Sequence, residues 1–259
     1  MLAQLTNLYK YREALRLLTW RELQVRYSNS VLGIVWSLLY PLMLTVFFSL
    51  AFTALNTHPV PNYPVFFLAA LLPWNTFSAT LLSATHSITG NSALVNRVAF
   101  PREIIPLGIT AANAISFLIA LIPLALLMLW YGVPFTWALL WFPFLLGAQI
   151  LFTMGLGLLL AALNVYLRDI QQFIEVFMLP WFFLTPIVYT PEALPVSLRS
   201  IVLALNPMAN LVTLYRQVIY AGQAPDLPWL GLAFLEGGLA LLVGLVIFNR
   251  LAPHFVDEL

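Results

Sequence analysis

The chain has 259 residues, of which 62% are hydrophobic and only 8% are charged. Soluble globular domains carry roughly 25% charged residues, so 11 basic and 10 acidic side chains are too few to cover this protein in water. The composition excludes a water-soluble enzyme, a disordered protein and a nucleic-acid-binding protein with a basic face. The chain has no cysteine, which excludes disulfides and thiolate ligands.

Ahead of the first apolar stretch, residues 5–27 predict an amphipathic helix suited to the cytoplasmic headgroup layer. The apolar face is expected to carry Leu8, Tyr11, Leu15 and Leu18, and the opposite face Arg12, Glu13, Arg16 and Thr19. A solvated arm that only sets topology is the alternative. We place a cytoplasmic entry segment at 1–30, before a single transmembrane domain at 31–259.

Long stretches without charge predict the membrane spans. No Lys, Arg, Asp or Glu occurs between Arg26 and Arg97 or between Glu103 and Arg168, and each stretch holds two spans of about 20 residues and a turn. The runs are apolar on all sides, which favours helices over barrel strands. We therefore expect an all-α integral membrane protein with six transmembrane helices, at 33–55, 63–85, 104–130, 137–163, 170–190 and 229–249.

Aromatic residues recur at helical spacing on the first and fifth predicted spans. The first carries Trp36, Tyr40 and Phe47, and the fifth carries Phe173, Phe177 and Trp181. Aromatic rings stack on sugar rings weakly enough to let a polymer slide, so these six residues are candidates for a substrate pathway. Packing between helices, or a place in the interfacial belts of the membrane, is the alternative.

The loop at 88–103 is expected to hold a short helix, capped by Asn91 or Ser92, that stops before Pro101. Its apolar side chains are Leu94, Val95, Val98 and Phe100. An exposed loop would not keep these groups without a partner, and Arg97 and Arg102 are available to acidic groups of that partner. The alternative is a turn packed on the chain's own bundle.

Between the last two predicted spans, residues 191–228 predict re-entrant helices. A helix at 196–205 ends at Asn206 and Pro207, which begin a second helix that ends near Gly222. Both are too apolar for exposed helices and too short to span. Segments of this kind persist at membrane depth where they are buried in protein or line a cavity, so this region is a candidate external gate.

Basic residues predict the orientation. Nine of them flank one side of the predicted spans, and the other side has only Arg199 and Arg216. By the positive-inside rule both termini are cytoplasmic. The first span begins too late and is too long for a cleaved signal peptide, and it is interpreted as a signal anchor.

Signatures of catalysis are missing from the sequence. It has no phosphate-binding loop, no H-E-x-x-H pair and no G-x-S-x-G elbow, so we expect no catalytic, cofactor or metal residues. Glu236 is the one plausible intramembrane acid, with Arg216 as its expected nearest partner. Snorkelling of Glu236 to the outer edge is the alternative.

Several short motifs, in order along nearly the whole chain, carry a family resemblance. They are Arg26-Tyr27-Ser28, 30–36 with Pro41, Asn91 with Leu94 and Val95, 100–106, 167–172, 185–189, 205–208 and Arg216. In this order and spacing they resemble the membrane permease of type-2 ABC exporters, in the branch that exports O-antigen and teichoic-acid polysaccharides.

The resemblance implies a homodimer of six-helix subunits above two cytoplasmic ABC ATPase subunits, which would use the ATP and Mg. It assigns ATPase coupling to Asn91, Leu94, Val95, Arg97, Phe100, Arg102 and Glu103. It assigns the cytoplasmic entrance to Leu32 and Gly33, and the external gate to Asn206, Pro207 and Arg216. One departure is Asn96 before Arg97, where the family often has two adjacent basic residues.

The expected function is export of a lipid-linked polysaccharide from the cytoplasm across the bacterial inner membrane. A type-2 ABC exporter for drugs or lipids is the alternative. A secondary transporter or a membrane enzyme would need intramembrane carboxylates, histidine relays or inverted repeats, and the sequence offers only Glu236.

Overall fold

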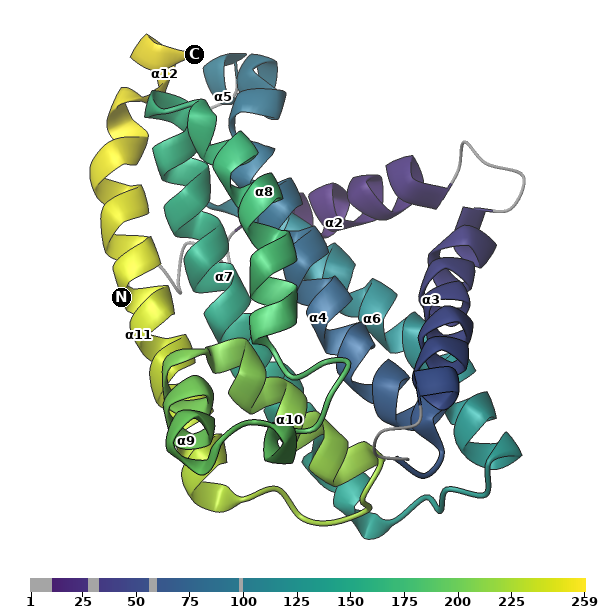
Figure 1. Ribbon diagram of the computed structural model, residues 1–259. Coiled ribbons are helices and arrows are strands. Elements are labelled where there is room, and N and C mark those ends of the chain that lie inside the picture. The colour runs from purple at the N-terminus through teal and green to yellow at the C-terminus, as the bar shows by residue number, and fades with distance from the viewer. Residues whose placement is uncertain (1–10, 28–32, 56–59, 98–99) are drawn as a thin grey trace.

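The computed structural model describes residues 11–27, 33–55, 60–97 and 100–259, and all regular structure within them is helical (Figure 1). The longer helices are α2 (Arg12–Tyr27), α3 (Gly33–Leu55), α4 (Tyr63–His86), α6 (Ile104–Trp130), α7 (Phe142–Tyr166), α8 (Asp169–Leu184) and α11 (Leu227–Leu251). The shorter ones are η1 (Thr89–Asn91), α5 (Ser92–Arg97), η2 (Trp137–Trp141), η3 (Pro191–Ala193), α9 (Val196–Leu205), α10 (Pro207–Ile219), η4 (Ala252–His254) and α12 (Phe255–Glu258). Leu8, Leu32 and Val98 lie outside the described residues.

Among the residues that the structure describes, four elements are long and apolar enough to cross a membrane: α4, α6, the continuous pair η2 and α7, and α11 with its extension to Glu258. Their positions agree with four of the predicted spans. The helix α3 has the predicted bounds, and it contains no Lys, Arg, Asp or Glu along its 23 residues.

The expected fifth span at 170–190 is wrong in its extent. The helix α8 ends at Leu184 after 16 residues, about 24 Å at 1.5 Å per residue, against a hydrocarbon core of about 30 Å. A residue before proline is pushed out of helical conformation, and Thr185, which precedes Pro186, is extended (φ −95°, ψ 130°). The helices α9 and α10 meet at 102°, as a re-entrant pair or a broken span would.

The buried centre of the bundle is α4, which contacts α3, α6, α7, α8 and α10. On the outside of the bundle α11 runs beside α7 (Figure 1). Two glycines allow this approach. A Cβ on Gly155 would lie under 3.0 Å from the backbone of Ala240 and Leu241, and one on Gly244 would meet the Gly155 carbonyl as closely. Small residues at a helix contact let membrane helices pack backbone to backbone.

The amphipathic helix α2 packs against α6. Its faces agree with the prediction, with Leu15 and Leu18 partly buried and Arg12 and Arg16 exposed, except at one position. Thr19, expected on the polar face, is 9% exposed and donates to the Leu15 carbonyl at 2.8 Å. Leu17 and Trp20 are 69% and 60% exposed. Thr19 follows Leu15 by four residues and so shares its helix face, and that face rests on α6 at Gly108.

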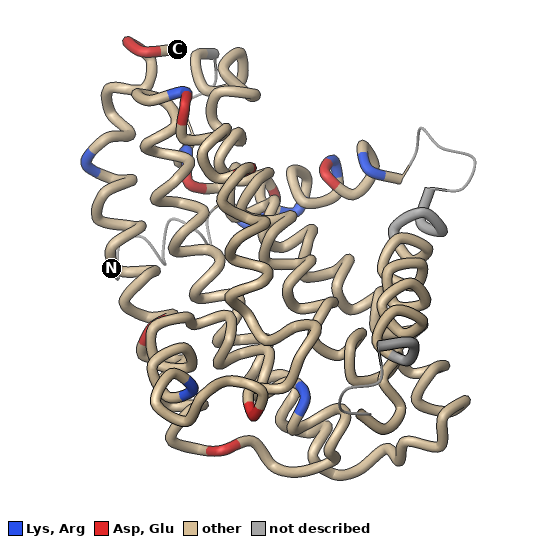
Figure 2. Tube along the Cα trace, in the orientation of Figure 1, with Lys and Arg blue, Asp and Glu red and all other residues tan. Residues whose placement is uncertain are grey.

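Charged residues gather toward two ends of the molecule (Figure 2). They lie on α2, beside α5 and α12, and around α9 and α10, while few occur on the long helices between these regions. This separation fits a bundle whose middle lies in hydrocarbon, where charges are costly.

Candidate functional site

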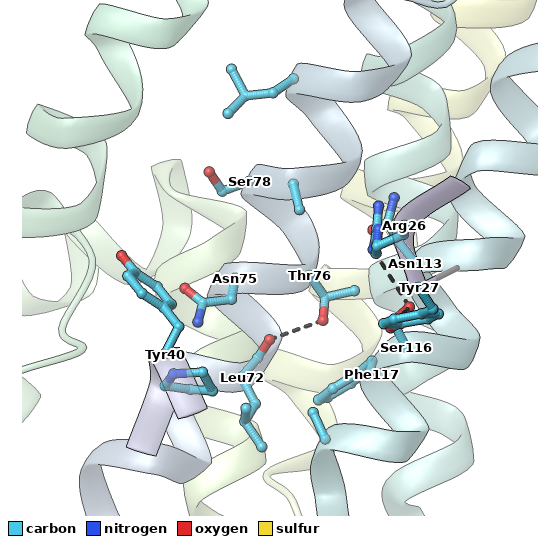
Figure 3. A pocket seen from close by; sticks show the side chains of 14 residues that line it. Arg26, Tyr27, Tyr40, Leu72, Asn75, Thr76, Ser78, Asn113, Ser116 and Phe117 are labelled. Atoms are coloured by element: carbon cyan, nitrogen blue, oxygen red, sulfur yellow. Dashed lines mark hydrogen bonds between the residues drawn. The ribbon is translucent and has the colours of Figure 1, made fainter. Parts of the chain in front are cut away.

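A cavity of 360 Å³ opens between α2, α3, α4 and α6, and its mostly apolar wall carries several polar side chains (Figure 3). Its polar lining residues are Arg26, Tyr27, Tyr40, Asn75, Thr76, Ser78, Asn113 and Ser116. Apart from Arg26 and Tyr27 on α2, they are carried by helices α3, α4 and α6 that are otherwise strongly apolar. Polar groups at such positions face bundle interiors or aqueous cavities and indicate a functional site.

One wall of the cavity is held together by hydrogen bonds between α2 and α6. Arg26 donates from Nη1 to Asn113 Oδ1 at 2.8 Å and to Ser116 Oγ at 3.4 Å. The Tyr27 hydroxyl lies 2.9 Å from Ser116 Oγ. Asn113 is 2% exposed and donates from Nδ2 to the Ile109 carbonyl at 3.1 Å, which fixes its amide.

Tyr40 is the predicted pathway residue that this cavity contains. It reaches the cavity from α3, beside Asn75 and across Thr76 from Arg26 (Figure 3). Phe47, two turns along α3, is 66% exposed. Gly33 begins α3, and the Trp36 side chain lies outside the described part of that helix.

The second predicted aromatic stripe divides into an exposed and an anchored part. The rings of Phe173 and Phe177 stack at 5.6 Å and are 61% and 37% exposed. The Trp181 ring packs edge-on against Phe77, with 5.0 Å between the ring centroids, and Trp181 Nε1 donates to Asn206 Oδ1 at 2.9 Å. The packing alternative therefore holds for Trp181, and Phe173 and Phe177 remain open to a ligand or lipid.

The loop at 88–103 forms η1 and α5 beside α12 (Figure 1), within the predicted limits. Val95 is 3% exposed and lies in an apolar cluster with Ile88, Ile105 and Phe255. The prediction that it awaits a partner is wrong, because its apolar contacts come from its own chain. Leu94 and Phe100 are only partly buried against the same cluster.

Among the polar residues of this loop, Asn91 connects two elements: it accepts from Arg21 Nη1 at 3.1 Å and donates to the Ser87 carbonyl at 2.9 Å. Arg102 donates to the Ala252 carbonyl, and its guanidinium lies 5.9 Å from the Phe255 ring centroid. Arg102 thus binds its own C-terminal segment.

Two more coupling residues were predicted in this region. Glu103 takes the N-cap position of α6 without a side-chain cap bond. Arg97 ends α5, and its side chain lies outside the described part.

In the predicted external gate, Asn206 caps α10, with Pro207 as its first residue. The Asn206 amide accepts from the Ala209 N–H at 3.3 Å and donates to Thr185 Oγ1 at 3.1 Å. This single side chain therefore joins the end of α8 to the start of α10. The predicted boundary between the two short helices is confirmed.

Arg216 is buried (5% exposed) and does not pair with Glu236, contrary to expectation. It donates from Nε to the Phe66 carbonyl at 3.1 Å, from Nη1 to the Pro186 carbonyl and to the Tyr189 carbonyl at 3.1 Å, and from Nη2 to the Ile187 carbonyl. The guanidinium also lies 3.5 Å from the Phe66 ring centroid. A planar fork of five donors suits this role, and Arg216 fixes the segment after α8 to α4.

Glu236 has one buried carboxylate oxygen, Oε2, without a hydrogen-bond partner in the described part of the chain. Within that part no group of three or more His, Cys, Asp or Glu residues could hold a metal ion.

The sequence prediction missed most of the cavity. Asn75, Ser78, Asn113 and Ser116 are lining residues that it did not single out. A signal was available, because uncharged polar side chains inside apolar spans are candidates for a pathway in their own right.

These features describe a multi-pass helical membrane protein with a cavity between α2, α3, α4 and α6 that carries several polar side chains. Residues 13–220 match the family of ABC-2 type transporters, and the chain belongs to this family.

Named relatives cover most of the chain. It is 35% identical over 227 residues to the O-antigen export system permease protein RfbA of Myxococcus xanthus, 87% of either chain. It is 28% identical over 254 residues to a protein of that name from Klebsiella pneumoniae, 98% of this chain and 97% of the relative. The polysialic acid transport protein KpsM of Escherichia coli is 24% identical over 248 residues, 88% of this chain and 90% of the relative.

Proposed function

We propose that this chain is the membrane permease of an ATP-driven exporter that moves a lipid-linked polysaccharide, of O-antigen or teichoic-acid type, out of the cytoplasm across the bacterial inner membrane. The observation that carries the proposal is the cavity with Tyr40 on its wall, inside the bundle of an ABC-2 type transporter. The names of the RfbA and KpsM relatives support a polymeric sugar as cargo.

A sugar polymer needs a path that binds each unit weakly and releases it. Tyr40 is 62% exposed and lies near the amide of Asn75 and the hydroxyl of Ser78, which can hydrogen-bond to sugar hydroxyls (Figure 3). The stacked rings of Phe173 and Phe177 offer a second apolar platform. Two copies of the chain would enclose a continuous path if these surfaces faced each other, and a homodimer is part of the proposal.

The energy source belongs to a second protein in this proposal. Two cytoplasmic ABC ATPase subunits would bind ATP and Mg and dock on the loop at 88–103, where Leu94 and Phe100 keep partly exposed apolar surface. Both termini would be cytoplasmic. Segment 191–228, held by Asn206 and Arg216, would form the external gate.

Export and folding have to be measured on the same variants. In a host that lacks the native gene, the wild-type chain and its neighbouring ATPase should restore polymer to the cell surface. Phe173→Ala and Phe177→Ala should lower that export while the chain stays folded, because both rings are exposed.

Leu179→Ala is the control, since Leu179 is 65% exposed on the same helix but outside the stripe. An equal loss of export in Leu179→Ala would contradict the aromatic path. Restored export of a lipid or a drug, with no polymer at the surface, would favour the alternative exporter class.

A further inference from the structure

Among its described lining residues, the cavity at α2, α3, α4 and α6 has one formal charge. Arg26 is cationic, and no Asp or Glu is among the lining residues. No salt bridge to Arg26 occurs among the residues that the structure describes. Arg26 is exposed, so an anion can reach its guanidinium, and hydrogen bonds between a guanidinium and a phosphate are strong.

The Arg26 guanidinium is oriented and mostly unused. It has five N–H donors, and the hydrogen bonds to Asn113 and Ser116 both leave from Nη1. The Asn113 amide is locked by its bond to Ile109, so the fork is held in place before any ligand arrives. Asn75 and the hydroxyls of Tyr27 and Ser78 lie around the same space as further donors (Figure 3).

We propose that Arg26, oriented by Asn113, makes this cavity a binding site for a phosphate-ester anion. A guanidinium fork matches two oxygens of a phosphate at once. A volume of 360 Å³ admits a phosphate or diphosphate together with an adjoining group. The phosphate comes either from an anionic phospholipid of the bilayer or from the group that joins a sugar polymer to its lipid. The second source rests on the proposed function, whereas anion binding itself does not.

Binding to the purified full-length chain tests the site without any export assay. The probes are phosphatidylglycerol, a polyprenyl diphosphate and, as a neutral control, phosphatidylcholine, measured by native mass spectrometry and by ligand-induced thermal shift. Loss of a charge-assisted hydrogen bond should weaken anion binding about 10- to 100-fold in Arg26→Gln.

Asn113→Asp is the sharper variant, because it keeps the shape of the side chain and supplies a carboxylate that neutralises Arg26. Asn113→Asp should weaken anion binding to the same degree. Because it also removes the donor to the Ile109 carbonyl, its melting temperature is measured beside that of the wild type. Arg26→Lys should keep part of the affinity. Arg16→Gln is the matched control, since it removes an exposed charge from α2 outside this cavity and should bind like the wild type.

Each outcome decides the proposal. Tighter binding of the polyprenyl diphosphate identifies the cargo as the source, and tighter binding of phosphatidylglycerol identifies the bilayer. The site is refuted if the wild-type chain binds no anionic probe over phosphatidylcholine, or if Asn113→Asp and Arg26→Gln bind like the wild type. Equal losses in Arg16→Gln would also refute it, because general surface charge would then explain the binding. A chain that binds anions but exports no polymer would contradict the proposed function alone.

Discussion

The contact of α7 with α11 offers the most direct test of the fold, through Gly155→Ala and Gly244→Ala. Each substitution adds one methyl group at a place where backbone meets backbone. The new Cβ atoms would lie under 3.0 Å from the Ala240 and Leu241 backbone or from the Gly155 carbonyl. Ordinary contacts begin at 3.4 Å, so the two helices must move apart, because each added Cβ would meet backbone and not the end of a flexible side chain.

The expected cost follows from that geometry. Overpacking costs about 1–3 kcal/mol where side chains can give way. Here no side chain can rotate aside, so we expect about 3 kcal/mol for each substitution. Alanine regains about 0.5–1 kcal/mol over glycine within a helix. The net loss of about 2 kcal/mol corresponds to a melting temperature about 4–8 °C lower for a chain of this size.

Thermal unfolding of the purified variants in one detergent measures this effect, with Gly238→Ala as the control on α11. A Cβ on Gly238 has no atom within 4 Å, so only the helix-propensity gain applies, and its melting temperature should equal or exceed that of the wild type. If Gly155→Ala and Gly244→Ala have the same melting temperature as Gly238→Ala, the close approach of α7 and α11 is wrong.

Three further predictions use contacts elsewhere in the chain. Val95→Asp should lower the yield of folded protein, because it buries an unpaired charge beside Ile88. Leu94→Asp should leave the yield intact and lower ATPase-coupled export. Equal yields of the two variants would contradict the burial of Val95. Arg216→Lys should lower the melting temperature, because a lysine cannot donate to the carbonyls of Phe66 and of the turn after α8 together. Each carbonyl left unsatisfied should lower the free energy of unfolding by about 1–3 kcal/mol. An unchanged melting temperature would refute this role. Glu236→Gln should unfold at the same or a higher temperature, since one carboxylate oxygen is buried without a partner, and a marked loss would show that the charge is used.

Local chemistry in the sequence determined the positions of most helices. The lengths of the charge-free stretches and the turns at Pro61 and Pro134 predicted α4, α6 and η2 with α7 nearly to their ends. The ends of these helices depend on the cost of charge in hydrocarbon and on the backbone geometry of proline. Both effects are determined by residues close together in the sequence. The same locality explains the break before α10, where Asn206 caps and Pro207 begins the helix.

Tertiary structure alone decided which side chains meet. The cavity joins Arg26, Tyr40 and Asn75 from three consecutive helices, together with Asn113 and Ser116 of α6, and no local pattern states that they face one space. Arg216 was expected to pair with Glu236 because both are charged, yet it donates to the Phe66 carbonyl of α4 and to carbonyls of the turn after α8. Val95 was expected to face a partner because it is apolar in a loop, but Ile88 and Phe255 cover it from the same chain. In each case the partner is set by the packing of the whole bundle, which the spacing of residues along the chain does not encode.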